Sequence, residues 1–287
     1  MKKLFLFALM AIAAISFNAC SKDDNGGETW VDDSPIIEFK DPKFLEILLL
    51  SHVGVYDDIK IDRNGDGQIS EKEAQSALYL HISNNIRTMD EIRYFTSLTD
   101  FSCNSNQLSS LNIDKNTSLQ RLCCEDNQLT SLDVSKNTAL TFLDCGSNQL
   151  TSLDLSKNIA LTELLCGGNQ LTKLDIIKNT ILTKLDCAYN QLISLDISTN
   201  STLTELVCSY NLLTSLDLDK KTELTFLYCG NNQLTSLDVS KCKKLKLLEC
   251  SGNSNLKSIT LYKYHVIGQT YLDKIIKEYG DIITYVE

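Results

Sequence analysis

Apolar residues recur along most of the chain with a period of 21 residues. One phrase, L-x-x-L-x-C-x-x-N-x-L-x-x-L-D-hydrophobic-S-K-N-T, describes the period, and residues 140–158 follow it closely. Two residue types stand 21 places apart without a slip: Cys103, Cys124, Cys145, Cys166, Cys187, Cys208, Cys229 and Cys250, and Asn106, Asn127, Asn148, Asn169, Asn190, Asn211, Asn232 and Asn253. Every turn of a stacked coil repeats one shape, so each position should form a column. The pattern predicts a solenoid whose core lies between neighbouring turns.

Each period also contains its apolar phrase twice, ten and then eleven residues on. The second phrase predicts two strand-like sides per turn and a flattened, weakly curved solenoid. A second asparagine column runs through Asn116, Asn137, Asn158, Asn179 and Asn200. Lys221 and Cys242 then take the asparagine place, so we expect the last turns to depart from regular geometry.

This pattern resembles the leucine-rich repeat family over about residues 98–261, and its half-period is similar to a bacterial class of such repeats. The resemblance implies an α/β repeat protein that is mostly β, with leucine-rich repeats at 95–262. Solenoid ends expose the core and need caps. We expect a helical, EF-hand-like cap at 36–94, with helices at 44–51 and 71–82. An α/β cap is expected at 263–287, with a helix at 268–279 and a strand at 282–286.

Cysteine is expected to act as a small apolar filler of the core. Parallel side chains in one column stay about 4.8 Å apart, which is too far for the usual Cβ separation of a disulfide. No histidine accompanies the column, so we interpret these cysteines as buried thiols rather than a metal stack. Cys123 should point outward by strand alternation and is a candidate reactive thiol.

The N-terminus has the pattern of an export signal. Lys2 and Lys3 precede an apolar run that ends at Cys20, and the run is too short for a stable membrane-spanning helix. The small residue before Cys20 resembles the lipobox of bacterial lipoproteins. We therefore expect a signal peptide at 1–19 and an acylated Cys20 followed by a flexible tether at 20–35. A lysine and two acids at 22–24 resemble a surface-export motif, although a generic solvated linker would look the same. The expected location is the outer membrane, facing outward.

The cap contains a twelve-residue segment that matches an EF-hand calcium loop. Oxygen-bearing residues occupy its first, third, fifth, seventh, ninth and twelfth places: Asp62, Asn64, Asp66, Gln68 (through its carbonyl), Ser70 and Glu73. Gly67 stands at the sixth place, where the loop turns sharply. No second loop of this form is present, so we expect calcium to stabilise the cap rather than to regulate the protein.

Charge and composition exclude several function classes. The chain carries 27 Lys and Arg against 37 Asp and Glu, a formal net charge of -10, which opposes binding of nucleic acid. His52, His81 and His265 lack triad or metal spacing, and we expect no enzymatic activity. A ladder of aspartates recurs on the second side of the turns, with lysines three residues on. We interpret this ladder as part of the scaffold.

Function is then expected on exposed positions that vary between repeats. Seven apolar residues are candidates for a partner-binding stripe: Phe142, Leu165, Tyr189, Val207, Tyr210, Phe226 and Tyr228. Aromatic residues that cover each other on a sheet face would give the same pattern. Resemblance to internalin-like bacterial adhesins favours binding of a protein or glycan during adhesion. A cell-envelope scaffold and a carbohydrate-capture component remain alternatives.

Overall fold

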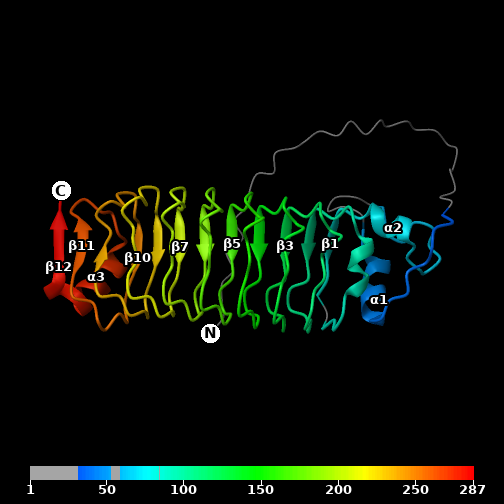
Figure 1. Cartoon of the computed structure of the whole chain (residues 1–287), viewed down its shortest axis with the longest axis horizontal. Helices are drawn as coiled ribbons and strands as arrows, with labels where there is room; N and C mark the ends of the chain where they lie inside the picture. The colour runs from blue at the N-terminus through cyan, green and yellow to red at the C-terminus, as the bar shows by residue number, and fades with distance from the viewer. Residues whose placement is uncertain (1–31, 53–58, 84) are drawn as a thin grey trace, which may run out of the picture. The chain divides into compact units, whose positions relative to one another are not determined.

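The computed structural model describes residues 32–52, 59–83 and 85–287. The expected signal peptide, Cys20 and the tether as far as residue 31 lie outside the described residues. Residues 32–287 form one compact unit, in which short strands stack side by side between an N-terminal and a C-terminal cap (Figure 1).

The main sheet has nine parallel strands in the order β1-β2-β3-β4-β5-β6-β7-β8-β10. These are β1 (Tyr79–His81), β2 (Asp100–Ser102), β3 (Arg121–Cys123), β4 (Phe142–Asp144), β5 (Glu163–Leu165), β6 (Lys184–Asp186), β7 (Glu205–Val207), β8 (Phe226–Tyr228) and β10 (Leu247–Glu249). Paired residues are 21 apart throughout this sheet, as for Leu143 and Leu164. In β4, β5 and β6 the middle residue is buried and its neighbours face outward, so each of these strands contributes one leucine to the core. The predicted repeat is confirmed.

The second side of each turn follows the predicted period with little regular strand pairing. Its apolar residues are buried, as Val134, Leu155 and Ile176 show with at most 1% of each exposed. Pairing develops only near the C-terminus of the described chain. There, β9 (Leu237–Asp238), β11 (Ile259–Tyr262) and β12 (Ile283–Val286) form a three-stranded parallel sheet.

The first asparagine column ties neighbouring turns together. Asn148 Nδ2 donates to the carbonyl oxygens of Cys124 (3.0 Å), Cys145 (3.2 Å) and Gly146 (2.9 Å), and its Oδ1 accepts from Leu129 N (2.9 Å). The same bonds recur along most of the column. A buried amide must find such partners, and the repeat supplies them in the same turn and in the preceding one.

The second asparagine column is bonded less completely. Asn158 Nδ2 donates to Val134 O (3.0 Å) and Asn137 O (2.9 Å). The buried Oδ1 atoms lack a hydrogen-bond partner throughout this column, at Asn116, Asn137, Asn158, Asn179 and Asn200. Lys221 then occupies the asparagine position with only 1% of its surface exposed.

Every cysteine that the structure describes is a buried free thiol, which confirms the core-filler interpretation. The expectation that Cys123 is an accessible, reactive thiol is wrong. Its position pairs with the outward-facing Ser102 and Asp144, but only 6% of its surface is exposed. Burial raises the pKa of Cys123 to about 11, so little thiolate forms near neutral pH.

The N-terminal cap begins with α1 (Pro42–Leu50), where Asp41 accepts from Lys43 N (3.0 Å) as the N-cap. The second helix, α2, spans only Glu71–Ser76, so the predicted helix at 71–82 is wrong beyond residue 76. The chain straightens there because Tyr79 to His81 pair with β2 and extend the sheet.

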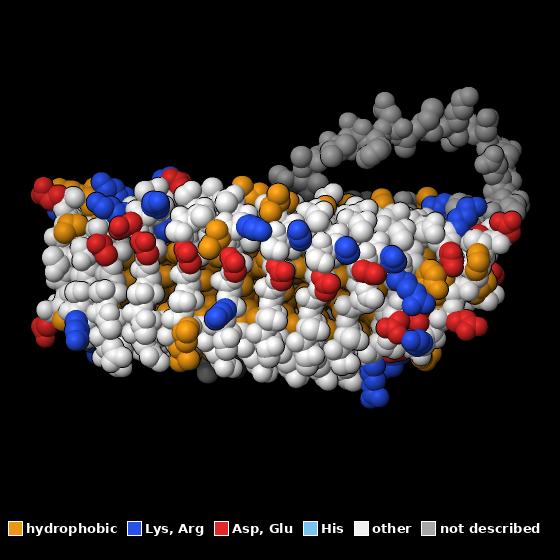
Figure 2. Space-filling model, viewed as in Figure 1, with side chains coloured by type: hydrophobic (Ala, Val, Ile, Leu, Met, Phe, Trp, Pro, Cys, Tyr) orange, Lys and Arg blue, Asp and Glu red, His pale blue; other side chains and the backbone are white. Residues whose placement is uncertain are grey.

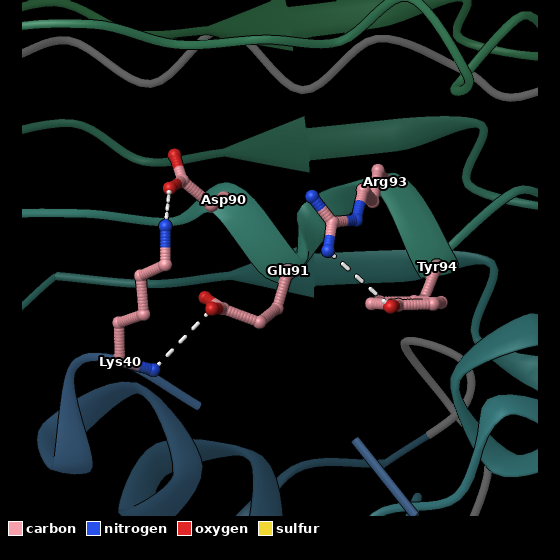
Figure 3. A network of polar contacts seen from close by, with 5 residues as sticks. All are labelled: Lys40, Asp90, Glu91, Arg93 and Tyr94. Atoms are coloured by element: carbon pink, nitrogen blue, oxygen red, sulfur yellow. Dashed lines mark hydrogen bonds and ion pairs between the residues drawn. The ribbon is translucent and has the colours of Figure 1, made fainter. Parts of the chain in front are cut away.

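A short 3-10 helix, η1 (Asp90–Tyr94), links this cap to the repeats through polar contacts (Figure 3). The Lys40 ammonium pairs with Asp90, and Lys40 N donates to Glu91 Oε1 (3.3 Å). The hydrogen bond from Lys40 lowers the pKa of Asp90. Arg93 Nη2 donates to the hydroxyl of Tyr94 (3.3 Å). The two contacts of Lys40 tie the segment before α1 to the beginning of the repeats.

The C-terminal cap has the predicted helix and strand. Helix α3 (Gln269–Tyr279) is followed by the 3-10 turn η2 (Gly280–Ile282) and by β12. Ile267 and Ile275 are buried at this end of the stack, and the Tyr279 hydroxyl accepts from Asn253 N (3.0 Å). Among the described residues, no helix combines the length and apolar character needed to cross a membrane.

Candidate binding face and calcium loop

The outward residues of the nine-stranded sheet form a surface that we call the sheet face. It has two columns, one from the first and one from the third residue of each strand. The first column contains Tyr79, Asp100, Arg121, Phe142, Glu163, Lys184, Glu205, Phe226 and Leu247; the second contains His81, Ser102, Cys123, Asp144, Leu165, Asp186, Val207, Tyr228 and Glu249.

The seven predicted partner-binding residues do not form one continuous stripe. Phe142 is separated from Phe226 in its column by charged residues, and Leu165 lies between Asp144 and Asp186. Val207 and Tyr228 are neighbours, and Phe226 lies in the same strand as Tyr228. The structure therefore concentrates apolar surface on β7 and β8.

Phe142 is covered by a neighbour rather than free. The guanidinium carbon of Arg121, one turn earlier, lies 3.5 Å from the centre of the Phe142 ring. Arg121 Nε is also 3.9 Å from Asp100 Oδ2. This arrangement is a cation–π contact, and it leaves less of Phe142 for a partner.

Tyr189 and Tyr210 lie just beyond the ends of β6 and β7 and stack on each other. Their ring centres are 4.2 Å apart and their planes differ by 10°. Both backbones have positive φ, 53° and 57°. Aromatic residues seldom adopt this left-handed conformation, which costs a bulky residue on the order of 1 kcal/mol. The exposed fractions are 59% for Tyr189 and 46% for Tyr210.

Two carboxylates of the sheet face, those of Asp144 and Asp186, are half-buried. Desolvation raises the pKa of Asp144 to about 6, and the nearby Glu125 and Asp186 add to this shift. Desolvation also raises the pKa of Asp186. Each accepts from a backbone amide two residues on: Asp144 Oδ1 from Gly146 N (3.1 Å) and Asp186 Oδ1 from Ala188 N (3.0 Å). Neither has an ion-pair partner among the described residues.

A different face of the solenoid carries the aspartate ladder. Figure 2 shows one face along which acidic side chains form a row with basic side chains beside it. Asp133 Oδ1 accepts from Ser135 N (2.8 Å), and Asp154 Oδ1 accepts from Ser156 N (2.8 Å). These backbone bonds are the largest cause of the lowered pKa of both aspartates, and the lysines contribute less. The ladder thus closes a local turn in each repeat, as a scaffold residue does.

The predicted calcium loop folds around its own backbone amides. Asp62 accepts from Gly65 N (2.8 Å) and Gly67 N (3.2 Å). Glu73 accepts from Arg63 N and Ser70 N, both at 2.9 Å. Positive φ values at both glycines, 72° and 77°, give the loop its sharp turns.

The rest of the loop is bonded in the same way. Asn64 Oδ1 accepts from Asp66 N (3.0 Å), and Asp66 Oδ1 accepts from Gln68 N (2.8 Å). Ser70 caps α2, since its hydroxyl accepts from Glu73 N (3.1 Å). The carboxylates thus face backbone amides, and no group of three or more His, Cys, Asp or Glu within the described ranges is arranged to hold a metal ion.

Asp32 is a further carboxylate at this loop that sequence reasoning missed. The Ser70 hydroxyl donates to Asp32 Oδ2. Burial opposes ionisation, but hydrogen bonds from Ser70 and Ser34 hold the pKa of Asp32 at about 2. The antiparallel bridge between Ile36 and Ser70 brings this segment to the loop. Because Asp32 lies thirty residues before the motif, no local spacing could have identified it.

Comparison with known proteins gives the class of the fold. The family model of leucine-rich repeats (two copies) matches residues 117–158 and 222–263. Together with the 21-residue register, this match defines the described unit as a leucine-rich repeat solenoid, a fold typical of protein-binding domains. Its solved structural neighbours include bacterial internalins.

Among solved structures, the chain is similar to the functional domain of InlJ from Listeria monocytogenes. The two share 35% identity with a TM-score of 0.55, over 68% of this chain and 51% of that one. The InlJ domain is described as including a cysteine ladder. The present chain thus spans about half the length of that domain.

Two other neighbours support the fold alone. A leucine-rich repeat protein of Leptospira interrogans is 23% identical with a TM-score of 0.60, over 76% of this chain and 62% of that one. Internalin C2 from Listeria monocytogenes is 22% identical with a TM-score of 0.54, over 69% and 86%. No curated protein matches the chain at a significant level.

Proposed function

We propose that this chain is a non-catalytic surface lipoprotein whose solenoid binds a protein partner through the sheet face. One observation carries the proposal: aromatic side chains remain exposed on or beside this face, although the repeat could fill those places with polar residues. Phe226 is 39% exposed, and Tyr189 and Tyr210 more so. Exposed aromatics of this kind supply much of the binding energy in protein interfaces.

Site-directed photo-crosslinking tests the binding face. A photoreactive residue replaces Phe226 on the sheet face or, as the matched control, Asp154 on the aspartate ladder. The full chain is expressed in its native cells, and these cells are then mixed with a preparation that contains candidate partner proteins. We expect one discrete crosslinked protein from position 226 that is absent from position 154. Equal crosslinking from both positions, or from neither, would contradict the proposal.

The anchor and location are part of the same proposal. Lys2, Lys3 and the apolar run before Cys20 support export with acylation of Cys20. Antibody labelling of intact cells, with and without added protease, tests the outward orientation. Labelling that protease removes would support adhesion. Labelling only after the outer membrane is opened would instead favour a cell-envelope scaffold.

We also propose that calcium binds the loop at 62–73 and stabilises the N-terminal cap. The donor set supports this proposal because it consists of oxygen atoms alone, which hard Ca²⁺ prefers. Asp62, Asp66 and Glu73 would hold the ion through carboxylates and Asn64 through its amide oxygen, with Gln68 contributing its carbonyl and Ser70 a direct or water-mediated contact. The cation would compete with backbone amides for the same carboxylates, so we expect modest affinity.

A further inference from the structure

A column of residues with positive φ borders the sheet face just beyond the ends of β2 to β8 and β10. Its members are Ser105, Asp126, Ser147, Gly168, Tyr189, Tyr210, Asn231 and Gly252. Six are glycine or small polar residues, which tolerate this backbone or hydrogen-bond locally within it. Only the two tyrosines place a large ring there. Residues with a strained backbone of this kind concentrate at binding sites. The tyrosine pair is therefore a candidate binding site.

The stack leaves one ring face of Tyr189 uncovered by its column. Tyr210 covers one face of the ring, and the next residue on the other side is Gly168, which has no side chain. Tyr210 has Asn231 as its outer neighbour. This difference agrees with the greater exposure of Tyr189. Tyr189 therefore offers an open aromatic platform at the edge of the sheet face.

Negative charge lies beside this platform. A Cβ built on Gly167 would be 3.1 Å from Asp186 Oδ1, so the Asp186 carboxylate lies beside Gly167, the residue before Gly168. Asp144 is two turns earlier in the same column, on the other side of Leu165. Within the described chain, neither carboxylate is paired with a lysine or arginine, whereas the nearby Lys184 ammonium pairs with Glu205 at 3.2 Å.

The sheet face already contains an example of how an aromatic ring and a carboxylate hold an arginine. Arg121 lies over the Phe142 ring of the next turn and also approaches Asp100. At Tyr189, the corresponding neighbour in the preceding turn is Gly168, so no side chain of the column covers the ring. An aromatic face and a carboxylate are present without the cation.

We infer that Tyr189 and Asp186 form a subsite for an arginine side chain from a basic segment of the partner protein. The planar guanidinium would stack on the open face of Tyr189 and pair with the Asp186 carboxylate. Charge complementarity favours this occupant, because the two sheet-face columns contain six carboxylates against one arginine and one lysine. The inference rests on the proposed function and specifies the chemistry of its partner.

Peptide binding to the purified full chain tests the subsite. The probe is a fluorescein-labelled octa-arginine peptide, followed by fluorescence anisotropy at 0.15 M salt, with octa-lysine as the comparison. We expect arginine to bind more tightly than lysine. Tyr189→Asn, which puts a residue suited to positive φ at this place, should weaken octa-arginine binding about tenfold. Tyr189→Phe keeps the ring and should stay within about twofold of the unmodified chain.

Asp186→Asn should weaken octa-arginine binding about fivefold, whereas the matched Asp154→Asn on the aspartate ladder should leave it unchanged. Thermal melting of each variant confirms that it folds. Equal binding by Tyr189→Asn and the unmodified chain, or equal affinity for arginine and lysine, would overturn the subsite. Binding of a neutral oligosaccharide such as cellohexaose in place of octa-arginine would also overturn it, in favour of a glycan platform. A partner crosslinked from position 226 would still support the proposed function, so the two failures are distinguishable.

Discussion

Lys221 occupies the position in the second asparagine column that Asn200 occupies one turn earlier. Asn200 Nδ2 donates to Ile176 O (3.2 Å) and Asn179 O (2.8 Å), which joins its turn to the preceding one. The corresponding acceptors for residue 221 are the carbonyl oxygens of Ile197 and Asn200. Desolvation lowers the pKa of Lys221, so the fold disfavours its charged form. We expect this turn to be less stable than its neighbours, and the substitution Lys221→Asn tests that expectation.

Lys221→Asn should raise the free energy of unfolding by about 1–3 kcal/mol at pH 7, because it restores two hydrogen bonds and removes a buried amine. Urea unfolding measures the gain. Because folding lowers the pKa of this amine, the ionised form of Lys221 destabilises the fold at low pH. This cost is lost as pH rises toward the pKa of the unfolded chain. The advantage of the variant should therefore shrink as pH rises toward 10.5. A variant no more stable than the unmodified chain would show that Lys221 has replaced the lost bonds.

The two asparagine columns should differ in what they contribute to stability. Asn148 makes four hydrogen bonds through its side chain, whereas Asn158 makes two and leaves Oδ1 unpartnered. We expect Asn148→Leu to cost about 3–4 kcal/mol and Asn158→Leu about 1–2 kcal/mol. Both variants are compared by urea unfolding. Equal losses would mean that volume, rather than hydrogen bonding, dominates at these positions.

The repeat made the scaffold predictable, because a 21-residue period places each residue type in the same environment in every turn. The columns of Cys103 and Asn106 could therefore be assigned from spacing alone. The helix predicted from the local pattern is wrong after Ser76, because the pairing of β1 with β2 outweighs the local preference for helix. Such pairing depends on a partner strand 21 residues away. Strand alternation gave the direction of Cys123 but not its burial, which its neighbours determine.

Predicting the candidate site was harder for a related reason. The sequence identified Tyr189 and Tyr210 as exposed candidates at strand ends. It did not show their positive φ, their stacking or the open ring face, since these depend on how the backbone turns there. The pKa of Asp144 likewise depends on desolvation by surrounding turns, which composition does not reveal.

Asp144→Asn should stabilise the protein above neutral pH. A carboxyl whose pKa rises from 3.8 to about 6 on folding favours the folded state at low pH, and this contribution is lost as pH rises between those values. At pH 8 the substitution should add about 1–2 kcal/mol, after allowance for solvent screening. An amide oxygen still accepts from Gly146 N. At pH 4 the gain should vanish, and thermal melting at both pH values measures it.

Asp154→Asn is the matched control with the opposite sign. A hydrogen bond from Ser156 N lowers the pKa of this aspartate, so its charge stabilises the fold above the unfolded pKa and the effect is lost as pH falls. The variant should be slightly less stable than the unmodified chain at pH 8. A gain at both positions would point to general relief of net negative charge rather than to desolvation of Asp144.

The thiols of the cysteine column should not react with thiol reagents until the protein unfolds. Burial raises the pKa of Cys187 well above its ordinary value, and none of its surface is exposed. Thiol titration with Ellman's reagent should therefore leave the described cysteines unmodified in the folded chain and modify them in 6 M guanidinium. Cys187→Ser should cost about 1–3 kcal/mol by burying a hydroxyl, and Cys187→Ala less. Rapid labelling of the folded chain would contradict the buried column.

Calcium should stabilise the N-terminal cap through the loop at 62–73. At a free concentration one hundred times the dissociation constant, a ligand that binds only the folded state adds about 2.7 kcal/mol. We expect the melting temperature to rise on addition of millimolar Ca²⁺ and to fall again with chelator. Binding must displace the bonds that Glu73 accepts from Arg63 N and Ser70 N, so the transition should depend on calcium concentration rather than saturate at trace levels.

Two variants separate a specific site from general charge effects. Glu73→Gln removes the last loop carboxylate and should abolish most of the calcium-dependent rise in melting temperature. Glu71→Gln, two residues earlier in α2 and outside the expected ligand set, removes the same charge and should retain that rise. A rise that survives in Glu73→Gln, or one that Mg²⁺ reproduces at equal concentration, would mean that cations screen the acidic surface rather than fill the loop.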